Sequence, residues 1–260
     1  MFLEIVLKLK EKEAIYKDGW NLSSASNNGL PERMRRAIRE KRFIFSLHSF
    51  IFNHLRHFAI RIVHPLFSFR INNIKYRYFT HKYNAIDGER CVEIPWVLTQ
   101  IDVNKKILEV GNVLSHYVNF SHTVVDRYER APEVINEDAE VFQPTTKYDF
   151  IISISTLEHI GFDETVKDDL KISRVISNLK SLINDGGKIL ITVPLVYNPT
   201  IDKIVINNDE GFSKMIFLKQ ISRFNRWKQC TLDEALKLKY GSKYPAANSV
   251  AFLVFDKQGV

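Results

Sequence analysis

The sequence predicts an α/β fold in which a seven-stranded, mostly parallel sheet is flanked by helices and follows a basic helical N-terminal extension. Short continuous apolar runs alternate with helical patterns between residues 89 and 260, as expected where parallel strands are buried on both faces. Residues 1–88 hold 16 Lys and Arg against 7 Asp and Glu, whereas the rest of the chain is slightly acidic. We therefore divide the chain into an extension, residues 1–88, and an α/β domain, residues 89–260.

The extension contains a long helical pattern from Glu32 to Val63, in which apolar residues recur every three or four positions. Arg56, Arg61 and several histidines make a membrane-spanning helix costly, so none is expected. Three interpretations stay open. The apolar face packs on the domain, residues 33–64 contact an anionic membrane peripherally, or the region binds nucleic acid. Nucleic acid is disfavoured, because no RNA- or DNA-binding module is recognisable.

A hairpin and a short helix connect the extension to the sheet. Residues 67–83 alternate aromatic or apolar residues with polar ones, which indicates a strand or hairpin. Residues 89–100 indicate a short helix. We expect a kink or break at Pro95, because proline lacks the backbone N–H that a helix interior uses.

Seven apolar runs are predicted as the strands of the sheet. They are residues 107–110, 122–125, 134–136, 148–154, 188–194, 214–221 and 249–256. A periodic segment from Asp163 to Ile183 predicts a helix that ends at the glycines 186 and 187. Residues 226–230 are expected to pair locally, and Thr231 begins a short helix with a capping box.

Polar residues follow successive strands and are therefore expected at one rim of the sheet, where open α/β sheets bind ligands. Glu109 ends the first strand and Gly111 follows it, while Asp126 and Asp138 follow the second and third strands. No Gly-x-Gly-x-x-Gly sequence is present at the first turn, so a pyrophosphate is not the expected ligand. A ligand with ribose hydroxyls, an adenine and a cationic centre suits these acids better, and S-adenosylmethionine has those parts.

These segments resemble the class I S-adenosylmethionine-dependent methyltransferases over roughly residues 89–260. LEVGN at 108–112 is similar to their first motif, YDFIISISTLEHIG at 148–161 to their fourth, and LINDGGKILITVP at 182–194 to the signature around the fifth strand. The resemblance implies a Rossmann-like fold whose last strand inserts antiparallel between its neighbours. It also implies methyl transfer from S-adenosylmethionine. The segment after Gly111 lacks the family's further glycines, so this loop must approach the cofactor differently.

The resemblance also implies roles for individual residues. The candidates for cofactor binding lie at the strand tips and are Glu109, Gly111, Asn112, Asp126, Asp138 and Ser155. His159 is the candidate base, because imidazole titrates near neutral pH, and Glu158 is expected to orient acceptor or cofactor. Acceptor-binding loops commonly follow the fifth strand, and the candidates there are Tyr197, Asn198 and Asp202.

Three further stretches resemble prokaryotic methyltransferases associated with cell-surface polysaccharide or glycolipid synthesis. They are YFTHKYN at 78–84, ERCVEIPW at 89–96 and YNPTID at 197–202. This narrower resemblance implies a small-molecule, glycan or lipid-linked sugar acceptor, and a cytoplasmic enzyme with peripheral contact at the inner membrane face. The alternative is a non-catalytic module of the same fold that docks on membrane or RNA through its basic extension.

The two cysteines argue against a metal centre. Cys91 and Cys230 are far apart in the sequence, and neither belongs to a Cys-x-x-Cys pair. No disulfide framework and no metal site are therefore expected, which suits a reducing cytoplasm.

Overall fold

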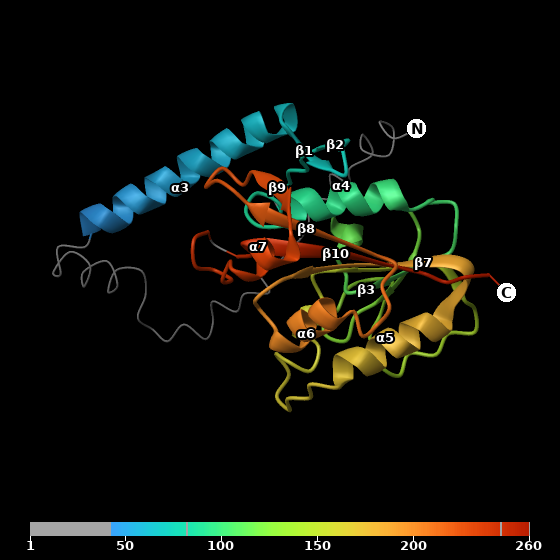
Figure 1. Cartoon of the computed structure of the whole chain (residues 1–260). Helices are drawn as coiled ribbons and strands as arrows, with labels where there is room; N and C mark the ends of the chain where they lie inside the picture. Colours follow the sequence, from blue (N-terminus) through green and yellow to red (C-terminus); the bar gives the residue numbers. More distant parts are fainter. Residues whose placement is uncertain (1–42, 82, 245, 260) are drawn as a thin grey trace, which may run out of the picture.

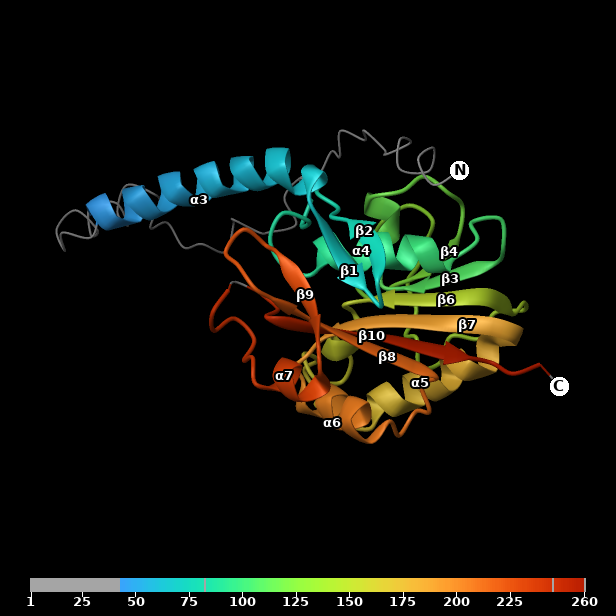
Figure 2. The ribbon, with the colours of Figure 1, turned by 45° about the horizontal axis from the view of Figure 1, so that its top comes forward.

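The computed structural model describes residues 43–81, 83–244 and 246–259 of the 260-residue chain. The predicted helix before Phe43, with its cluster of arginines, lies outside the described residues. In the described part of the chain, the central feature is an eight-stranded mixed sheet with the order β5-β4-β3-β6-β7-β10-β8-β9 (Figure 2). Helices cover both of its faces (Figure 1).

Strands with continuous apolar sequences form the parallel half of the sheet. They are β3 (Ile107–Val110), β4 (Thr123–Val125), β5 (Val134–Ile135), β6 (Tyr148–Ile154) and β7 (Ile183–Pro194). Leu108 pairs with Thr123 on one side and Ile151 on the other, so β3 lies in the middle of this half. Because these strands are parallel, their carboxyl ends meet at one rim, as predicted.

The other half of the sheet is antiparallel. β10 (Ser249–Asp256) lies between β7 and β8 (Lys214–Gln220) and runs antiparallel to both, which confirms the insertion expected for the last strand. The prediction of seven strands was wrong, because β9 (Trp227–Cys230) pairs with β8 and adds an eighth. Trp227 is buried at this edge, so β9 is part of the core. α7 (Leu232–Leu236) follows β9 and has the predicted capping box.

Alternating side chains of the central strands supply a separate core on each face of the sheet. Ile107 belongs to the core that contains α4 (Arg90–Gln100), whereas Leu108 belongs to the core that contains α5 (Lys171–Leu182). α6 (Pro199–Asn207) lies on the same face as α5, as Figure 1 shows. The sheet is thus the middle of three layers, and its rim is accessible between them.

The predicted hairpin consists of β1 (Ser68–Ile71) and β2 (Ile74–Arg77) and packs into the core on the α4 side. Tyr78, directly after β2, accepts a hydrogen bond from the backbone N–H of Trp227 at 2.7 Å. Its hydroxyl also donates to the Trp227 carbonyl at 3.3 Å. The hairpin is therefore bonded to the edge strand of the main sheet.

α4 continues through Pro95, contrary to the predicted break. Proline removes the N–H that would bond to the carbonyl four residues earlier, which belongs to Cys91. That carbonyl instead accepts from the backbone N–H of Phe79 at 2.9 Å. A residue of the hairpin region replaces the missing helical donor, so the helix does not need to end.

α5 is shorter than the predicted helix at both ends. It begins at Lys171 and not at Asp163, because the backbone N–H of Asp168 bonds to the carbonyl of Gly161 and closes residues 161–168 into a loop. At the other end, Ile183 takes an extended conformation and enters β7 directly. Gly186, with a φ of 74°, lies inside β7 and does not terminate the helix as expected.

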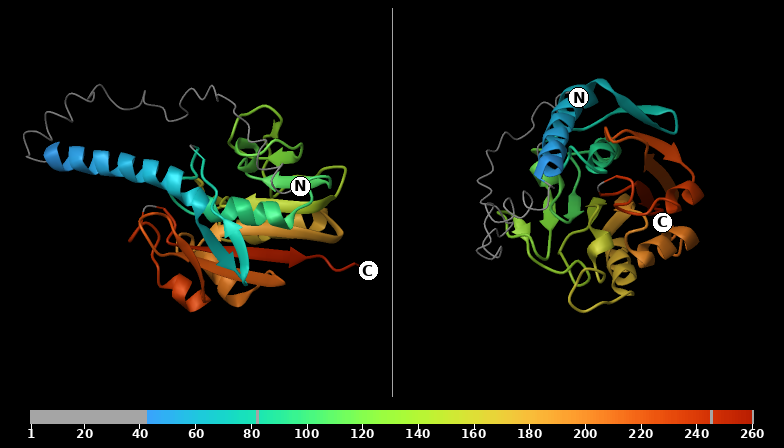
Figure 3. Two further views of the ribbon diagram at one scale, coloured as in Figure 1. Left: turned by 90° about the horizontal axis from the view of Figure 1, so that it is seen from above. Right: turned by 90° about the vertical axis from the view of Figure 1, so that its left-hand side faces the viewer.

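α3 (Phe43–Val63) runs along one side of the molecule and extends beyond the sheet (Figure 3). It is followed by the short 3₁₀ helix η2 (His64–Leu66). Its buried side contains Ile60 and Arg56, and the Arg56 guanidinium bonds to both carboxylate oxygens of Asp87 at 2.6 and 2.7 Å. No helix in the described residues is both long and apolar enough to cross a membrane.

The opposite side of this segment carries an exposed apolar stripe. Its members are Phe52, Leu55, Phe58, Ile62 and Leu66. Leu55 and Phe58 are 63% and 64% exposed. The interpretation in which the apolar face packs on the domain therefore does not hold for these described residues. The apolar periodicity correctly predicted a helix but did not identify its buried side.

Candidate functional site

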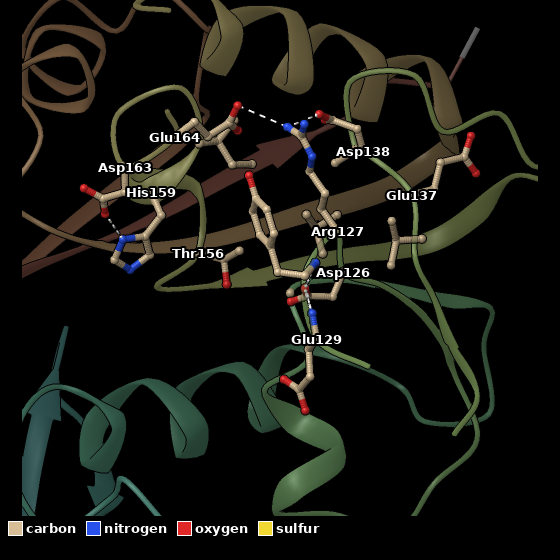
Figure 4. A pocket seen from close by; sticks show the side chains of 15 residues that line it. Asp126, Arg127, Glu129, Glu137, Asp138, Thr156, His159, Asp163 and Glu164 are labelled. Carbon is tan, nitrogen blue, oxygen red and sulfur yellow. Dashed lines mark hydrogen bonds and ion pairs between the residues drawn. The ribbon is translucent and has the colours of Figure 1, made fainter. Parts of the chain in front are cut away.

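A cavity of about 600 Å³, called here the large cavity, opens at the rim formed by the carboxyl ends of the parallel strands (Figure 4). Segments that follow β3, β4, β5 and β6 line it. Of the predicted site residues, it brings together Gly111, Asp126, Asp138 and His159. Their convergence follows from the parallel arrangement of the strands.

Gly111, which follows β3, lines the large cavity. Its φ is 88°, and a Cβ at this position would collide with the Thr156 side chain. Its backbone N–H bonds to the carbonyl of Val125 at 2.9 Å, which joins the ends of β3 and β4. Glycine is therefore required both by the backbone conformation and by the close approach of the loop after β6.

Glu109 does not line the large cavity, although its sequence position suggested it. Its fully buried carboxylate accepts from the backbone N–H groups of Val113 and Leu114 at 3.0 and 2.7 Å. His122 Nε2 lies 2.8 Å from its other oxygen. These bonds hold the loop that enters η3 (Leu114–His116), so the described role of Glu109 is to shape the cavity wall. Cofactor binding by Glu109 stays a prediction.

Asp126 organises the loop after β4. One carboxylate oxygen accepts from the backbone N–H groups of Tyr128 and Glu129 at 2.8 and 2.7 Å. The other accepts from the backbone N–H of Asn112 at 3.3 Å. The Asn112 side chain donates to Glu129 at 2.7 Å and is not part of the cavity lining. Asn112 thus braces the cavity-lining residues Asp126 and Glu129.

Asp138 lines the large cavity and pairs with two cationic side chains. Arg127 reaches between Asp138 and Glu164 at 2.9 and 3.1 Å, as Figure 4 shows. The buried Lys171 ammonium bonds to the same two acids at 2.7 and 2.8 Å. Burial raises the pKa of Asp138, but the hydrogen bonds from Lys171 and the Glu140 N–H, together with the charges of Lys171 and Arg127, outweigh it, and the net pKa lies below its usual range. Asp138 is therefore ionised at neutral pH.

His159, at the end of the 3₁₀ helix η4 (Leu157–His159), lines two cavities at once. The second, called here the small cavity, has a volume of about 200 Å³. His159 Nδ1 lies 2.5 Å from Asp163 Oδ2, and the Tyr197 hydroxyl donates to the same oxygen at 2.6 Å. Burial raises the pKa of Asp163, but the hydrogen bonds from Tyr197 and His159 bring it below its usual range. The ionised carboxylate favours a proton on Nδ1 and leaves Nε2 as the acceptor nitrogen.

Buried charged groups lie in and behind the lining of the small cavity, which includes Arg90 but not Glu93. Arg90 bonds to Glu93 at 2.9 Å and to the carbonyl of Ile154 at 3.0 Å, while the Ser155 hydroxyl donates to Glu93 at 2.6 Å. Glu158 lines this cavity and is only 1% exposed. Burial raises the pKa of Glu158 well above its usual value. Two predicted residues, Ser155 and Glu158, thus lie at the small cavity and outside the lining of the large one.

The three residues predicted after β7 differ in their positions. Tyr197 lines the small cavity. Asn198 is 1% exposed, accepts from the Thr200 N–H at the start of α6 and donates to the Glu158 carbonyl at 2.8 Å. Asp202 accepts from the Val196 N–H at 2.9 Å, and burial raises its pKa. Asn198 and Asp202 therefore hold the loop that presents Tyr197, and direct acceptor contact by either stays a prediction.

Several lining residues were missed from the sequence. They are Glu89, Arg90, Glu129, Asp163, Glu164 and Tyr240. Glu89 and Arg90 begin the ERCVEIPW stretch, which was recognised without a role for its first two residues. Asp163 and Glu164 were assigned to a helix that begins only at Lys171. No sequence signal marked Glu129 or Tyr240.

Comparison with known proteins connects this geometry to a reaction. A family model described as a methyltransferase domain matches residues 95–240, which is more than half of the chain. The chain belongs to this methyltransferase family. It is therefore an enzyme of methyl transfer, as the motifs predicted. A comparison with curated proteins gives no significant match.

Solved structures similar to the methyltransferase include a SAM-dependent methyltransferase from Thermotoga maritima, described as a possible histamine N-methyltransferase. It is 14% identical, with 64% of this chain and 88% of that chain covered and a TM-score of 0.39. Another is the N-methyltransferase NodS from Bradyrhizobium japonicum in complex with S-adenosylhomocysteine. It is 12% identical, with 63% and 91% of the two chains covered and a TM-score of 0.37.

The cofactor of the methyltransferase is S-adenosylmethionine, and the residues of the large cavity fit it. The acidic residues among the described lining are Asp126, Glu129, Glu137, Asp138, Asp163 and Glu164. Arg127 is the one Lys or Arg in that lining. A sulfonium with an α-ammonium group is favoured by this charge, and the carboxylates supply acceptors for ribose hydroxyls and for an adenine amine. The absent side chain of Gly111 leaves room beside β3.

Proposed function

We propose that the methyltransferase acts on a glycan or lipid-linked sugar of the kind made in cell-surface polysaccharide synthesis. One observation carries this proposal. The three stretches of the narrower resemblance lie far apart in the sequence, yet Asn84, Arg90 and Tyr197, one from each, line the same small cavity. This cavity shares His159 with the large cavity, so an acceptor held in it faces the cofactor site.

The residues around His159 suit a reaction that needs proton removal. Bound S-adenosylmethionine supplies an electrophilic methyl carbon on a positively charged sulfur. Asp163 holds the His159 ring through Nδ1, and Tyr197 fixes Asp163 in turn. The acceptor nitrogen, Nε2, is thereby oriented to take a proton from the acceptor, which is the role proposed for His159. The loop after β6 is held by two hydrogen bonds. Arg90 donates to the Ser155 carbonyl, and the Ser155 hydroxyl donates to Glu93.

Titration calorimetry tests the cofactor site. S-adenosylmethionine should bind saturably to the full chain, and Asp126→Ala should weaken binding by about tenfold or more, since it removes an acceptor for the ribose hydroxyls. Asp185→Ala removes an exposed acid of β7 that lines neither cavity, and it should have no effect. No saturable binding by the unaltered chain would contradict the proposed function.

Labelled methyl transfer tests the acceptor class. The enzyme is incubated with S-adenosylmethionine labelled in its methyl group and with separate lipid-linked sugar, protein and RNA fractions. Label should enter the sugar fraction and should be lost with His159→Ala, which removes the proposed base. Incorporation into protein or RNA instead would contradict the assignment.

We also propose that the enzyme works at the inner membrane face and contacts anionic lipid through residues 33–64. The exposed apolar stripe of α3 supports this, because Leu55, Phe58 and Ile62 have no partner surface among the described residues. The charge of the extension is complementary to anionic lipid. Amphipathic helices with basic flanking residues typically insert their apolar side into the headgroup region of a membrane.

Vesicle sedimentation tests the lipid contact. The full chain should sediment with phosphatidylglycerol vesicles and less with phosphatidylcholine vesicles, and Leu55→Glu with Phe58→Glu should abolish the difference. Ile206→Glu replaces an exposed apolar residue on α6 and should behave like the unaltered chain. Self-association that depends on the same stripe, seen by analytical ultracentrifugation, would show that a second copy covers it instead.

A further inference from the structure

The small cavity contains two carboxyl groups with buried oxygens that have no hydrogen-bond partner. Glu158 Oε2 and Glu89 Oε2 are both of this kind, and both residues line the cavity. Glu158 is 1% exposed, so water outside the cavity does not solvate it. Burial favours the protonated form of both groups in the unliganded chain, and a cation bound between them would favour their ionised forms, so such a pair indicates a ligand that supplies donors and positive charge.

The neighbouring cations make no hydrogen bond to the Oε2 atom of either acid. The guanidinium of Arg90 is directed to Glu93 at 2.9 Å and to the carbonyls of Ile154 and Ser155 at 3.0 and 3.4 Å. The charge of the Arg90 guanidinium is therefore balanced by Glu93. Asp87, which also lines the cavity, is paired with Arg56 at 2.6 Å and with His57 at 2.5 Å. Glu89 Oε2 and Glu158 Oε2 therefore remain without a hydrogen-bond donor, while Glu158 Oε1 lies 3.7 Å from His159 Nε2.

Aromatic rings complete the cavity. Tyr197 and Tyr240 both line it, with their ring centroids 4.9 Å apart. Aromatic faces beside carboxylates attract a cation through the ring quadrupole and repel an anion. A hydroxyl offers one donor and no charge, whereas an ammonium offers three donors and a positive charge. The cation satisfies both carboxyl groups, and a phosphate or carboxylate group is excluded.

We propose that the acceptor atom is the nitrogen of an amine, bound as an ammonium between Glu89 and Glu158. This inference rests on the proposed function, because it names the acceptor group of the same reaction. The ammonium first passes one proton to Nε2 of His159, which frees the nitrogen lone pair. The lone pair then forms the N–CH₃ bond while the sulfonium S–CH₃ bond breaks and its electrons stay on sulfur. The product is a methylated ammonium that the same carboxylates hold.

The test compares cyclohexylamine with cyclohexanol, which share a ring and differ in the group offered to the carboxylates. Each is titrated calorimetrically into the full chain, with and without S-adenosylhomocysteine. The amine should bind saturably and at least about tenfold more tightly than the alcohol. Glu89→Gln and Glu158→Gln should each weaken amine binding by about tenfold and leave alcohol binding unchanged. S-adenosylhomocysteine affinity should be retained in both variants.

Two controls separate the outcomes. Glu158→Asp keeps the charge and should retain part of the amine affinity, whereas Asp185→Asn removes a remote acid and should retain all of it. Three results would overturn the inference if S-adenosylhomocysteine still binds. The amine and the alcohol bind equally well, the amine does not bind, or Asp185→Asn weakens amine binding as much as the Glu89 and Glu158 variants do. Absence of S-adenosylhomocysteine binding would instead overturn the proposed function, and the amine measurement made without it would remain interpretable.

Discussion

Gly111 and Gly186 have similar positive φ angles, 88° and 74°, but differ in their surroundings. A Cβ on Gly111 would collide with Thr156, whereas a Cβ on Gly186 would meet nothing within 4 Å. Gly186→Ala should therefore cost only the conformational strain, about 1–2 kcal/mol in urea unfolding. Gly111→Ala should cost more and also abolish S-adenosylhomocysteine binding, measured by calorimetry. Equal effects of the two substitutions on binding would contradict this.

Glu89 makes the stability depend on pH. Burial, with Glu93 nearby, raises the pKa of Glu89 from 4.5 to about 7. Between these values the folded chain keeps a proton that the unfolded chain releases, so rising pH lowers the free energy of unfolding. Glu89→Gln should be more stable than the unaltered chain by roughly 2–3 kcal/mol at pH 8, with no gain near pH 4. Urea unfolding across this pH range checks it, and parallel pH profiles would contradict it.

Single residues at the strand tips were predictable, because the end of an apolar run fixes where the next side chain lies. Gly111, Asp126 and Asp138 reach the large cavity for this reason. Glu109 follows the same logic but points into the core, since strand alternation decides its side and the loop N–H groups then bind it. Glu89 does not follow a strand. It lies before α4, and the packing of α4 on the sheet brings it to the small cavity.

At the scale of elements, Lys171 fixes the beginning of α5. Its ammonium bonds to Asp138 and Glu164, and its side chain is only 7% exposed. Lys171→Met should therefore destabilise the chain by roughly 1–3 kcal/mol, because two partly buried acids each lose one of their two cationic partners. Arg174, one turn later, pairs with Glu140 and Asp168 but is 45% exposed, so Arg174→Ala should have a much smaller effect on the free energy of unfolding. Thermal unfolding of the two variants measures this difference. Similar losses of stability in both would contradict the role given to Lys171.

The same element shows where periodicity fails. Val166 and Leu170 have helical spacing relative to the apolar residues of α5, so the prediction included them. In the structure they lie before the helix and are 78% and 69% exposed. The segment before the helix is held by the backbone bond from Asp168 to Gly161 and by ion pairs of Glu164 with Arg127 and Lys171. Such bonds leave no periodic trace in the sequence.

At the scale of the whole molecule, the hairpin belongs to the folded core. Phe69, Ile71, Tyr76 and Tyr78 are all buried in the cluster that contains α4. A chain that begins at residue 67 should therefore unfold cooperatively. A chain that begins at residue 89 should not, because it loses roughly 6 kcal/mol or more of apolar burial, comparable to the total stability of a domain. Near-ultraviolet circular dichroism on heating distinguishes the two, and a cooperative transition of the shorter chain would support a domain boundary at residue 88.

The layered arrangement was the most predictable property of the molecule. Alternation of strands and helices gave the parallel sheet, and the family resemblance gave the antiparallel position of β10. The direction in which α3 presents its apolar stripe was not predictable. A helical period specifies that one side is apolar, and it does not specify whether protein, lipid or a second copy covers that side.

The position of β10 has a consequence for folding kinetics. It separates β7 from β8, although it follows both in the chain. Until it docks, the sheet consists of two halves, and β7 and β8 each have an open edge with unpaired backbone groups. Open apolar edges pair readily with other chains. Refolding from urea is therefore expected to be slow and to lose yield as the protein concentration rises.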